Sequence, residues 1–266
     1  MQSWLDKWLL KLNINKCMVV SYGRRIEFIS DYCLKSDNIL HSLEHLDSIK
    51  DLGVLFDSNL KFDQHIIEKV NKAYSVLGLI HRHFRHMSSD TFVMLYKTLV
   101  RSQLEYANVV WSPCRQMDIE KLEKVQMRAT KILSQMRKCS YENRLRLLNL
   151  PTLRYRRMRG DMIQVFNIIS GMYDNNAVVK FNMSHVSNTR GNKYKLQLTH
   201  IHYNLQKHFF SNRIIEVWNS LPNDVVLAES TNIFKNRLDK FWANQDFKYD
   251  WNAEISGIGS RSVNII

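Results

Sequence analysis

A scarcity of residues that interrupt helices is the feature that most constrains this chain. Its 266 residues include three prolines and eight glycines. A sandwich of many short strands needs such residues at its frequent turns, whereas long helices joined by short connections do not. Because 45% of the residues are hydrophobic, the chain can also bury a substantial core. The sequence therefore predicts a folded and mainly helical protein.

Hydrophobic periodicity changes at the turn formed by residues 57–59. Before this turn, the apolar stretch Cys17–Val20 and the segment Ile49–Phe56 have the character of short strands. After it, apolar residues recur at helical spacing. The first such face carries Ile66, Val70, Tyr74, Leu77 and Ile80. This order predicts an α+β fold that is predominantly α-helical, with a small β element at its start.

Helical patterns continue to the C-terminal region. They predict a helix that is capped by a side chain of Ser88, Ser89 or Asp90 and carries Phe92, Leu95, Leu99 and Leu104, a helix from about Asp118 to Leu133, a short helix before Pro151 and a long helix toward Gly171. The polar region 173–200 breaks the periodicity and is predicted to be a linker. Two further helical patterns follow it, and the tail after Trp251 is predicted to be disordered.

Charge and cysteine content narrow the functional classes. Lysine and arginine total 38 against 25 acidic residues, which gives a net charge of +13 and favours a polyanionic partner. Cys17, Cys33, Cys114 and Cys139 are scattered and form no Cys-x-x-Cys, so we expect neither a zinc ribbon nor a disulfide framework. With no signal peptide and no long apolar run, the sequence predicts an intracellular protein of the nucleus or cytoplasm without membrane contact.

Spaced sequence blocks suggest a family. They are Leu12–Cys17, Leu52–Asp57, Phe62–His65, Leu104–Ala107 with Trp111–Pro113, Leu122–Gln126, Leu150–Pro151, Thr189–Gly191, Trp218–Pro222 and Phe234–Lys235. In content and order these blocks resemble the late palm, thumb and C-terminal extension of non-LTR retrotransposon reverse transcriptases, particularly those of jockey-like elements. The resemblance implies a C-terminal fragment of an RNA-directed DNA polymerase.

The resemblance implies an arrangement of domains. Residues 1–61 would be a late palm remnant with a primer-grip-like hairpin, and residues 62–138 a helical thumb. A basic helical extension over 139–172, the polar linker 173–200, a C-terminal helical region over 201–251 and a tail over 252–266 would follow. The expected partners are an RNA/DNA template-primer duplex and the missing N-terminal polymerase portion.

The catalytic machinery of such polymerases is expected to be absent. They hold two metal ions with aspartates that include an Asp-Asp pair, and this sequence contains no such pair. The chain alone is therefore predicted to be inactive, with no cofactor of its own and Mg²⁺ only in the complete polymerase. Lys16 stands where the family has a palm lysine that can act as a general acid. A surface lysine at a turn is the alternative for Lys16.

The resemblance gives other residues positioning roles. Leu52, Gly53, Val54, Leu55, Phe56 and Asp57 match the primer grip. The alternative is an ordinary hairpin whose Leu52, Val54 and Phe56 pack a core, and both interpretations can hold together. Cations of the predicted thumb are candidates for phosphate contacts: Lys69, Lys72, Arg82, Arg85, Lys97, Arg101, Lys121, Lys124, Arg128 and Lys131. For any single one, a solvated helix face is the more common role.

The densest positive segment contains Arg154, Arg156, Arg157 and Arg159 near a helix start. At 100° per residue, only pairs three apart share a face, so the four arginines cannot all point one way. We rank this segment first for RNA or DNA contact. A solubilising helix start is an equally good interpretation.

Some histidines and aromatic residues are candidates for ligand binding but also have an ordinary structural explanation. No metal site is predicted, because two groups of histidines lack the cysteine or glutamate partners of known metal sites: His41 with His45, and the cluster His81, His83 and His86. Trp218, Phe234, Phe241 and Trp242 could stack on unpaired bases, yet their helical spacing favours a core.

Two further hypotheses compete with a polymerase fragment. The chain could be a stand-alone nucleic-acid-binding protein derived from the element, or a helical protein-interaction scaffold. A steep dependence of binding on salt would distinguish phosphate contacts from an apolar interface. We also expect exposed apolar surface and poor solubility, because strands that would cover residues such as Val19 and Phe56 are missing; a shorter chain that begins near Lys61 should behave better.

Overall fold

The structure is a computed structural model, and it divides into two units. It describes residues 4, 7–10, 12–23, 32–36, 39–84, 86–174, 176–184, 194–198 and 204–258. One unit comprises Met1–Glu68 and the other Lys69–Ile266. Arg85, the Thr189–Gly191 block and the end of the tail, which carry sequence-based expectations, lie outside the described residues.

The first unit is built from short strand pairs. A 3₁₀ turn, η1 (Ile14–Lys16), precedes β1 (Met18–Val19), which pairs in parallel with β4 (Glu44–His45). β2 (Cys33–Ser36) and β3 (Ile39–Ser42) form an antiparallel pair, as do β5 (Ser48–Asp51) and β6 (Val54–Asp57). The predicted hairpin is thus present, and its turn residues Leu52 and Gly53 both have positive φ, as in the tight turns that suit hairpin twist.

Residues beyond the hairpin hold it against the start of α2 (Asp63–His83). The fully buried His65 accepts a hydrogen bond at Nδ1 from the backbone N–H of Leu55, 3.1 Å away. The Asp57 carboxylate accepts from three backbone N–H groups in the connecting turn, including that of Phe62 at 2.7 Å. Asp57 is therefore an organiser of the turn that leads into α2.

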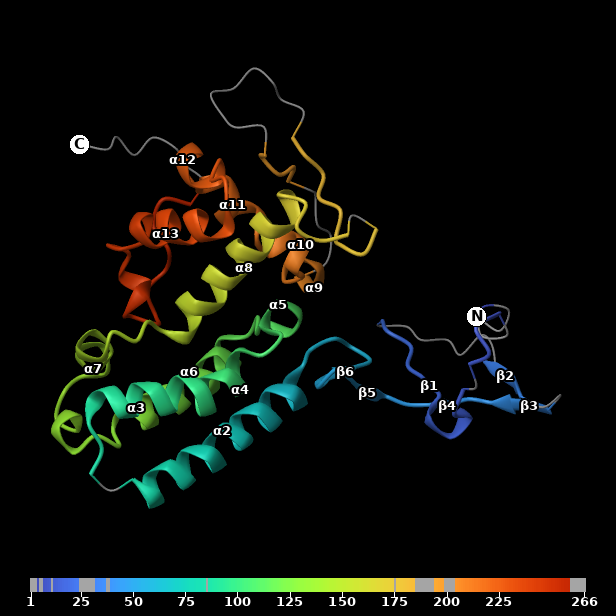
Figure 1. Cartoon of the computed structure of the whole chain (residues 1–266), viewed down its shortest axis with the longest axis horizontal. Coiled ribbons are helices and arrows are strands. Elements are labelled where there is room, and N and C mark those ends of the chain that lie inside the picture. Colours follow the sequence, from blue (N-terminus) through green and yellow to red (C-terminus); the bar gives the residue numbers. More distant parts are fainter. Residues whose placement is uncertain are drawn as a thin grey trace. The chain divides into compact units, whose positions relative to one another are not determined.

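Helices make up the second unit (Figure 1). The predicted apolar stripe of α2 is confirmed, since Ile66, Val70, Leu77 and Ile80 are buried and Tyr74 is half-buried. Ser88 caps α3 (Ser89–Leu95) by accepting from the N–H of Thr91. A π-helical segment, η2 (Tyr96–Arg101), then leads into α4 (Ser102–Glu105) and, after a left-handed residue at Ala107, into α5 (Asn108–Trp111).

The π-helical segment explains why one expected helix face differs. Its wider turn keeps residues four apart on one side, so Phe92, Tyr96, Val100 and Leu104 are all buried. Leu99, which the sequence pattern assigned to the same stripe, is exposed. A regular period of 3.6 does not hold where the helix widens.

α8 (Leu153–Ile169) lies between two groups of helices in the second unit (Figure 1). It packs against α5 and against α6 (Gln116–Thr130) of the first group. The turn η3 (Ser134–Met136) and α7 (Tyr141–Leu148) connect α6 to α8. The second group comprises α9 (Asn204–Lys207), α10 (Phe210–Arg213), α11 (Ile215–Ser220), α12 (Asn223–Val226), α13 (Thr231–Phe241) and the turn η4 (Asp246–Lys248).

Aromatic residues fill the core between α8 and the second group. Phe166 stacks on Phe234 at a centroid distance of 4.4 Å, and Trp218 lies 6.0 Å from Phe234. Described parts of the region 173–200 pack here as well: the Trp218 indole donates to the Tyr194 carbonyl, and Asn219 makes two hydrogen bonds with the Leu196 backbone. These parts of the predicted linker therefore lie on the C-terminal core.

The predicted fold class is confirmed, because a mostly helical structure follows small two-stranded sheets. None of the described helices combines the length and the hydrophobicity needed to cross a membrane.

Candidate nucleic-acid interface

A groove runs between the C-terminal half of α2 and the end of α6 with the segment that follows it. Two adjoining hollows of about 770 Å³ and 310 Å³ share Gly78, His81, Ile132 and Arg137 in their walls. Tyr74, Leu77, Gly78 and His81 recur at helical spacing, so the side of α2 that borders its buried stripe faces the groove. The groove is therefore a product of the α2 periodicity.

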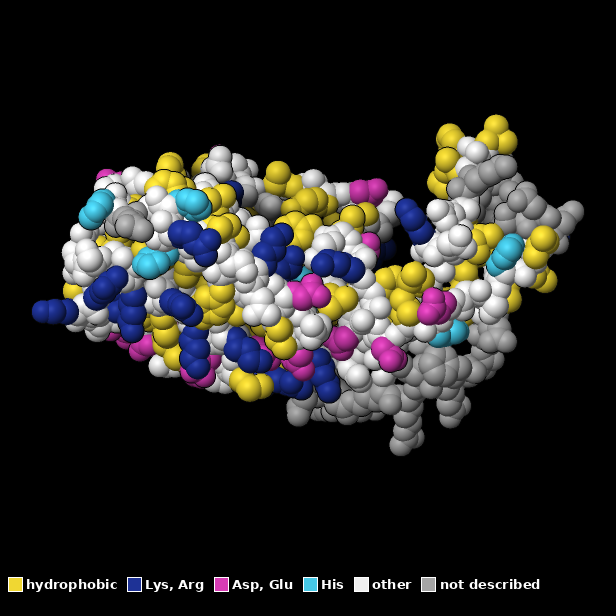
Figure 2. Space-filling view, turned by 90° about the horizontal axis from the view of Figure 1, so that it is seen from below, with side chains coloured by type: hydrophobic (Ala, Val, Ile, Leu, Met, Phe, Trp, Pro, Cys, Tyr) yellow, Lys and Arg dark blue, Asp and Glu magenta, His cyan; other side chains and the backbone are white. Residues whose placement is uncertain are grey.

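Positive charge dominates the groove. Arg82, Arg128, Lys131 and Arg137 line it and are exposed, and neither hollow has an aspartate or glutamate in its described wall. Within the part of the chain that the structure describes, these four cations form no ion pair with a carboxylate. Figure 2, which shows the side on which α2 lies, displays lysine and arginine side chains gathered over the helical unit, with histidines among them. The groove is therefore suited to an anion.

Tyr74 orients one cation of the groove. The Arg128 guanidinium lies 5.4 Å from the centre of the Tyr74 ring, within the range of a cation–π interaction. A cation–π contact leaves the guanidinium N–H groups able to donate to a ligand, and among the described residues Arg128 forms no ion pair with a carboxylate. Phosphate oxygens accept from such edges, often through two parallel hydrogen bonds.

Other predicted thumb cations differ in their surroundings. Lys121 pairs with Asp118 at 2.8 Å and Lys124 with Glu120 at 2.9 Å, so both have partners on α6 itself. Lys69 lies 5.5 Å from the centre of the Tyr106 ring, and Lys72 and Lys97 are exposed. Of the four α6-region candidates, the structure brings Arg128 and Lys131 into the groove and leaves Lys121 and Lys124 outside its walls.

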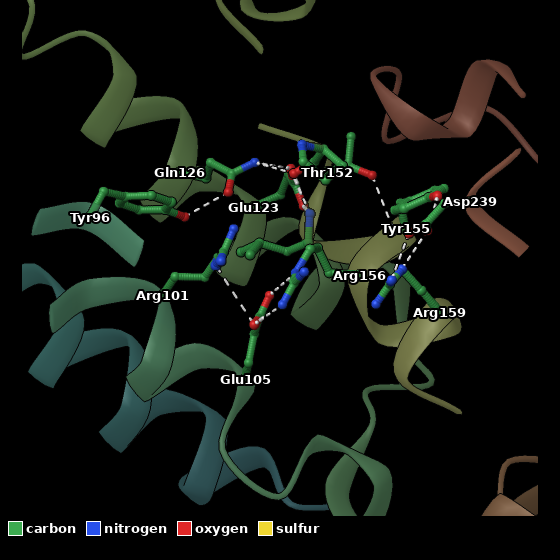
Figure 3. A network of polar contacts seen from close by, with 12 residues as sticks. Tyr96, Arg101, Glu105, Glu123, Gln126, Thr152, Tyr155, Arg156, Arg159 and Asp239 are labelled. Atoms are coloured by element: carbon green, nitrogen blue, oxygen red, sulfur yellow. Dashed lines mark hydrogen bonds and ion pairs between the residues drawn. The ribbon is translucent and has the colours of Figure 1, made fainter. Parts of the chain in front are cut away.

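Two arginines of α8 are engaged by distant carboxylates (Figure 3). Arg156 donates two hydrogen bonds to Glu105, both 2.7 Å long, and Arg101 approaches the same carboxylate at 3.7 Å. Arg159 donates two hydrogen bonds to Asp239 of α13. Because Glu105 belongs to the first helical group and Asp239 to the second, these pairs connect α8 to both.

The remaining arginines of the segment also point into the protein. Arg154 donates to the carbonyls of Trp251 and Ala253, at 3.2 and 2.9 Å. Arg157 is buried, and its Nη2 has no hydrogen-bond partner among the described residues. Burial lowers the pKa of Arg157, while the nearby Glu123, Glu105 and Asp161 counteract that effect. The alternating directions expected for the four arginines thus lead to four different internal environments.

A buried polar network fixes the start of α8 (Figure 3). The Tyr96 hydroxyl donates to Gln126, 2.6 Å away, and the Gln126 amide donates to the Pro151 carbonyl. The Glu123 carboxylate accepts from the Tyr141 hydroxyl and from the Leu153 N–H, the latter at 3.0 Å. A carboxylate at this position complements the positive end of the helix dipole. Burial nonetheless raises the pKa of Glu123, and these hydrogen bonds offset only part of that rise.

A second internal carboxylate acts further along α8. Asp161 accepts two hydrogen bonds from Arg213 of α10, both 2.9 Å long, and Arg213 also donates to the Val109 carbonyl of α5. Burial raises the pKa of Asp161, and its contact with Arg213 works in the opposite direction. Arg213 and Asp161 therefore tie both helical groups to α8.

The remaining predicted site residues have these positions. Lys16 is exposed in η1, and residues 52–57 form the turn and second strand of the hairpin, with Leu52 exposed at its tip and Val54 buried. Trp218, Phe234 and Trp242 are core residues, whereas Phe241 is exposed. In the described residues no cluster of three metal-ligating side chains occurs.

The carboxylates that accept hydrogen bonds from the α8 arginines were not identified from the sequence. Arg137 was also not identified as a residue of the groove. Glu105 and Glu123 did lie inside two of the blocks that carry the family resemblance, which was a signal for their importance. Nothing local distinguished Asp239, because it is 80 residues from Arg159. The groove itself needs the packing of α2 against α6, which the sequence does not display.

Comparison with known proteins gives a distant and partial relationship. The chain is 25% identical over 140 residues to the RNA-directed DNA polymerase from the mobile element jockey of Drosophila funebris. This match covers 50% of the chain and 14% of that polymerase. The chain is also 27% identical over 130 residues to an uncharacterized protein of Caenorhabditis elegans, a match that covers 48% of the chain and 66% of that protein. No family model and no solved structure matches.

Proposed function

We propose that this chain is a C-terminal part of an RNA-directed DNA polymerase of a non-LTR retrotransposon, and that it contributes template-primer binding. The observation that carries the proposal is the partial similarity to the jockey polymerase. The order of the sequence blocks, the hairpin before α2 and the net charge of +13 support it. Without an Asp-Asp pair, the chain positions nucleic acid rather than adding nucleotides.

The groove cations are the proposed phosphate contacts. Arg82, Arg128, Lys131 and Arg137 lack carboxylate partners among the described residues, so binding a phosphate costs them no internal ion pair. Before they could bind a phosphate, Arg156 and Arg159 of α8 would have to give up their contacts with Glu105 and Asp239. Their contact with nucleic acid stays a prediction, and the groove is the better-supported surface. The proposed role of residues 52–57 is to hold the primer strand.

Binding of the whole chain to an RNA–DNA hybrid across a salt series tests the proposal. The affinity should fall steeply with salt, with a log–log slope of about 0.9 for each phosphate contact. A variant with Arg82, Lys131 and Arg137 changed to alanine should bind more weakly and show a shallower slope. The matched control changes Lys121 and Lys124 to alanine on the same surface. Binding that is equal in all three proteins, or that ignores salt, would contradict the proposal.

A stand-alone nucleic-acid-binding role is the second candidate. The similarity to the nematode protein favours it, because the matched segment forms 66% of that protein. A segment of this kind thus makes up most of another chain. This candidate predicts that the isolated protein binds the hybrid as tightly as it does in the presence of the polymerase's N-terminal portion.

A further inference from the structure

The groove has an apolar wall in addition to its cations. Phe84, Met87, Ile132 and Leu133 line the larger hollow, and the Phe84 side chain is 43% exposed. Ser88, Ser134 and Gln135 add polar groups to the same wall, although the Ser88 hydroxyl also caps α3 and the Gln135 amide also donates to Ser89. The groove thus presents three kinds of surface together: positive charge, an accessible aromatic ring and polar donors and acceptors.

These surfaces fit different parts of a nucleotide. Phosphates need the cations, whereas bases offer flat faces for stacking and polar edges for hydrogen bonds. In a duplex the base faces are stacked on one another, so a regular hybrid would leave Phe84 without a use. An unpaired strand can turn its bases toward an aromatic side chain while its backbone stays on the cations.

The size and the openness of the groove also fit an unpaired strand. The larger hollow, at about 770 Å³, is within the range of pockets that bind small organic ligands. Apart from the neighbouring residues and backbone of α2 itself, no atom lies within 4 Å of the position that a Cβ of Gly78 would occupy, so the floor of the groove is open along α2. The groove continues past Gly78 to Tyr74 through the second hollow, which gives it room for consecutive nucleotides.

We propose that this groove binds nucleic acid where a strand leaves the duplex unpaired: the phosphates lie on Arg82, Arg128 and Arg137, which contact the backbone of paired and unpaired strands alike, and the unpaired bases lie against Phe84. The inference rests on the proposed function, because it assigns a single-stranded stretch next to the template-primer duplex to a place on the same surface. It adds a preference for unpaired over paired nucleic acid, which positive charge alone does not produce.

Three RNA–DNA hybrids of equal duplex length distinguish the outcomes. One is blunt, one has a single-stranded overhang, and one has the same overhang without bases. The full chain should bind the overhang hybrid on the order of tenfold more tightly than the blunt one, and the abasic overhang should supply only a small part of this gain. Equal affinity for blunt and overhang hybrids, or an abasic overhang as good as the natural one, would overturn the inference.

Two variants locate the effect in the groove. Phe84→Ala should remove most of the overhang preference and leave binding of the blunt hybrid unchanged. Gly78→Leu should place a side chain in the groove and reduce the preference in the same way, while the melting temperature stays equal or rises because glycine is a poor helix former. An unchanged overhang preference in both folded variants would overturn the assignment to this groove.

The design separates the inference from the proposed function. Loss of the overhang preference alone, with salt-sensitive binding of the blunt hybrid retained, contradicts only the unpaired-strand site. Failure to bind any of the three hybrids at low salt contradicts the template-primer role as well.

Discussion

Two basic regions of the helical unit differ in what surrounds their charges. On α8, Arg156 and Arg159 face Glu105 and Asp239 from other helices, and Arg154 donates to backbone carbonyls. Around the groove, Arg82, Lys131 and Arg137 have no carboxylate partner in the described residues. The densest run of arginines in the sequence is therefore an internal connector. The cations available to a ligand come from three separate segments.

The difference shows that the density of charge does not identify a binding surface. An arginine that is paired inside the protein stabilises the packing of helices, and its removal is expected to act on stability first. An exposed and unpaired arginine is expected to act on ligand binding with little effect on stability. Each prediction below tests one side of this comparison.

Arg156→Ala should have the largest effect on stability. It leaves the mostly buried Glu105 without its bidentate partner, so the free energy of unfolding should fall by about 3 kcal/mol. Urea denaturation measures this change. Glu105→Ala combined with Arg156→Ala should cost less than the sum of the single changes, because the two residues interact directly. A loss below about 0.5 kcal/mol in Arg156→Ala would show that the connector is not stabilising.

Arg159→Ala should cost less, about 1 kcal/mol, because its partner Asp239 is 44% exposed and water screens the pair. The same denaturation experiment checks it. If this variant were as unstable as Arg156→Ala, exposure of the partner would not be what separates the two pairs.

The pH dependence of stability should report on Glu123. Because burial raises the pKa of Glu123 in the folded protein, the stabilisation from its neutral form is complete below the ordinary value of 4.5 and is lost as pH rises through the folded pKa. The stability of the wild-type protein relative to Glu123→Gln should therefore decline from about pH 4.5 toward neutral pH. Denaturation curves for both proteins at several pH values measure this, and a difference that grows with pH in favour of the wild type contradicts the burial argument.

Changing Lys121 and Lys124 to alanine should have the smallest effect on hybrid affinity. Lys124 pairs with Glu120 at the surface of α6, and such a pair contributes less than about 1 kcal/mol, whereas Lys121 pairs with the buried Asp118 and its loss acts on stability. Hybrid affinity should change by about twofold or less, because neither lysine lines the groove. A loss as large as that of the Arg82, Lys131 and Arg137 variant would extend the binding surface across α6.

Local patterns predicted the features that depend on neighbouring residues. The α2 stripe from Ile66 to Ile80, the Ser88 cap and the hairpin around Gly53 follow from periodicity, capping and turn chemistry, and the structure contains all three. The exposure of Leu99 was missed because the π-helical widening at η2 depends on tertiary packing. In the unit before α2, Val19 and Phe56, for which exposure was expected, are half-buried, whereas Trp4, Trp8 and Leu40 are exposed.

The candidate site was less accessible to sequence reasoning. Arg156 and Glu105 are 51 residues apart, and no local signal indicates that they meet. Arg128 and Lys131 were among the predicted contacts, yet so were Lys121 and Lys124, and only the packing of α2 on α6 separates the two pairs. The direction in which a charged side chain points decides its role, and that direction is a property of the folded helices.

The most direct test removes two charges from each basic region and compares both effects. One protein carries Arg82→Gln and Arg137→Gln, the other Arg156→Gln and Arg159→Gln, and each is measured for hybrid affinity and for urea stability at a temperature where both are folded. We expect the groove variant to lose affinity with unchanged stability, and the α8 variant to lose stability with unchanged affinity. Loss of affinity in the α8 variant together with full affinity in the groove variant would contradict the account and make the arginines of α8 the nucleic-acid contact.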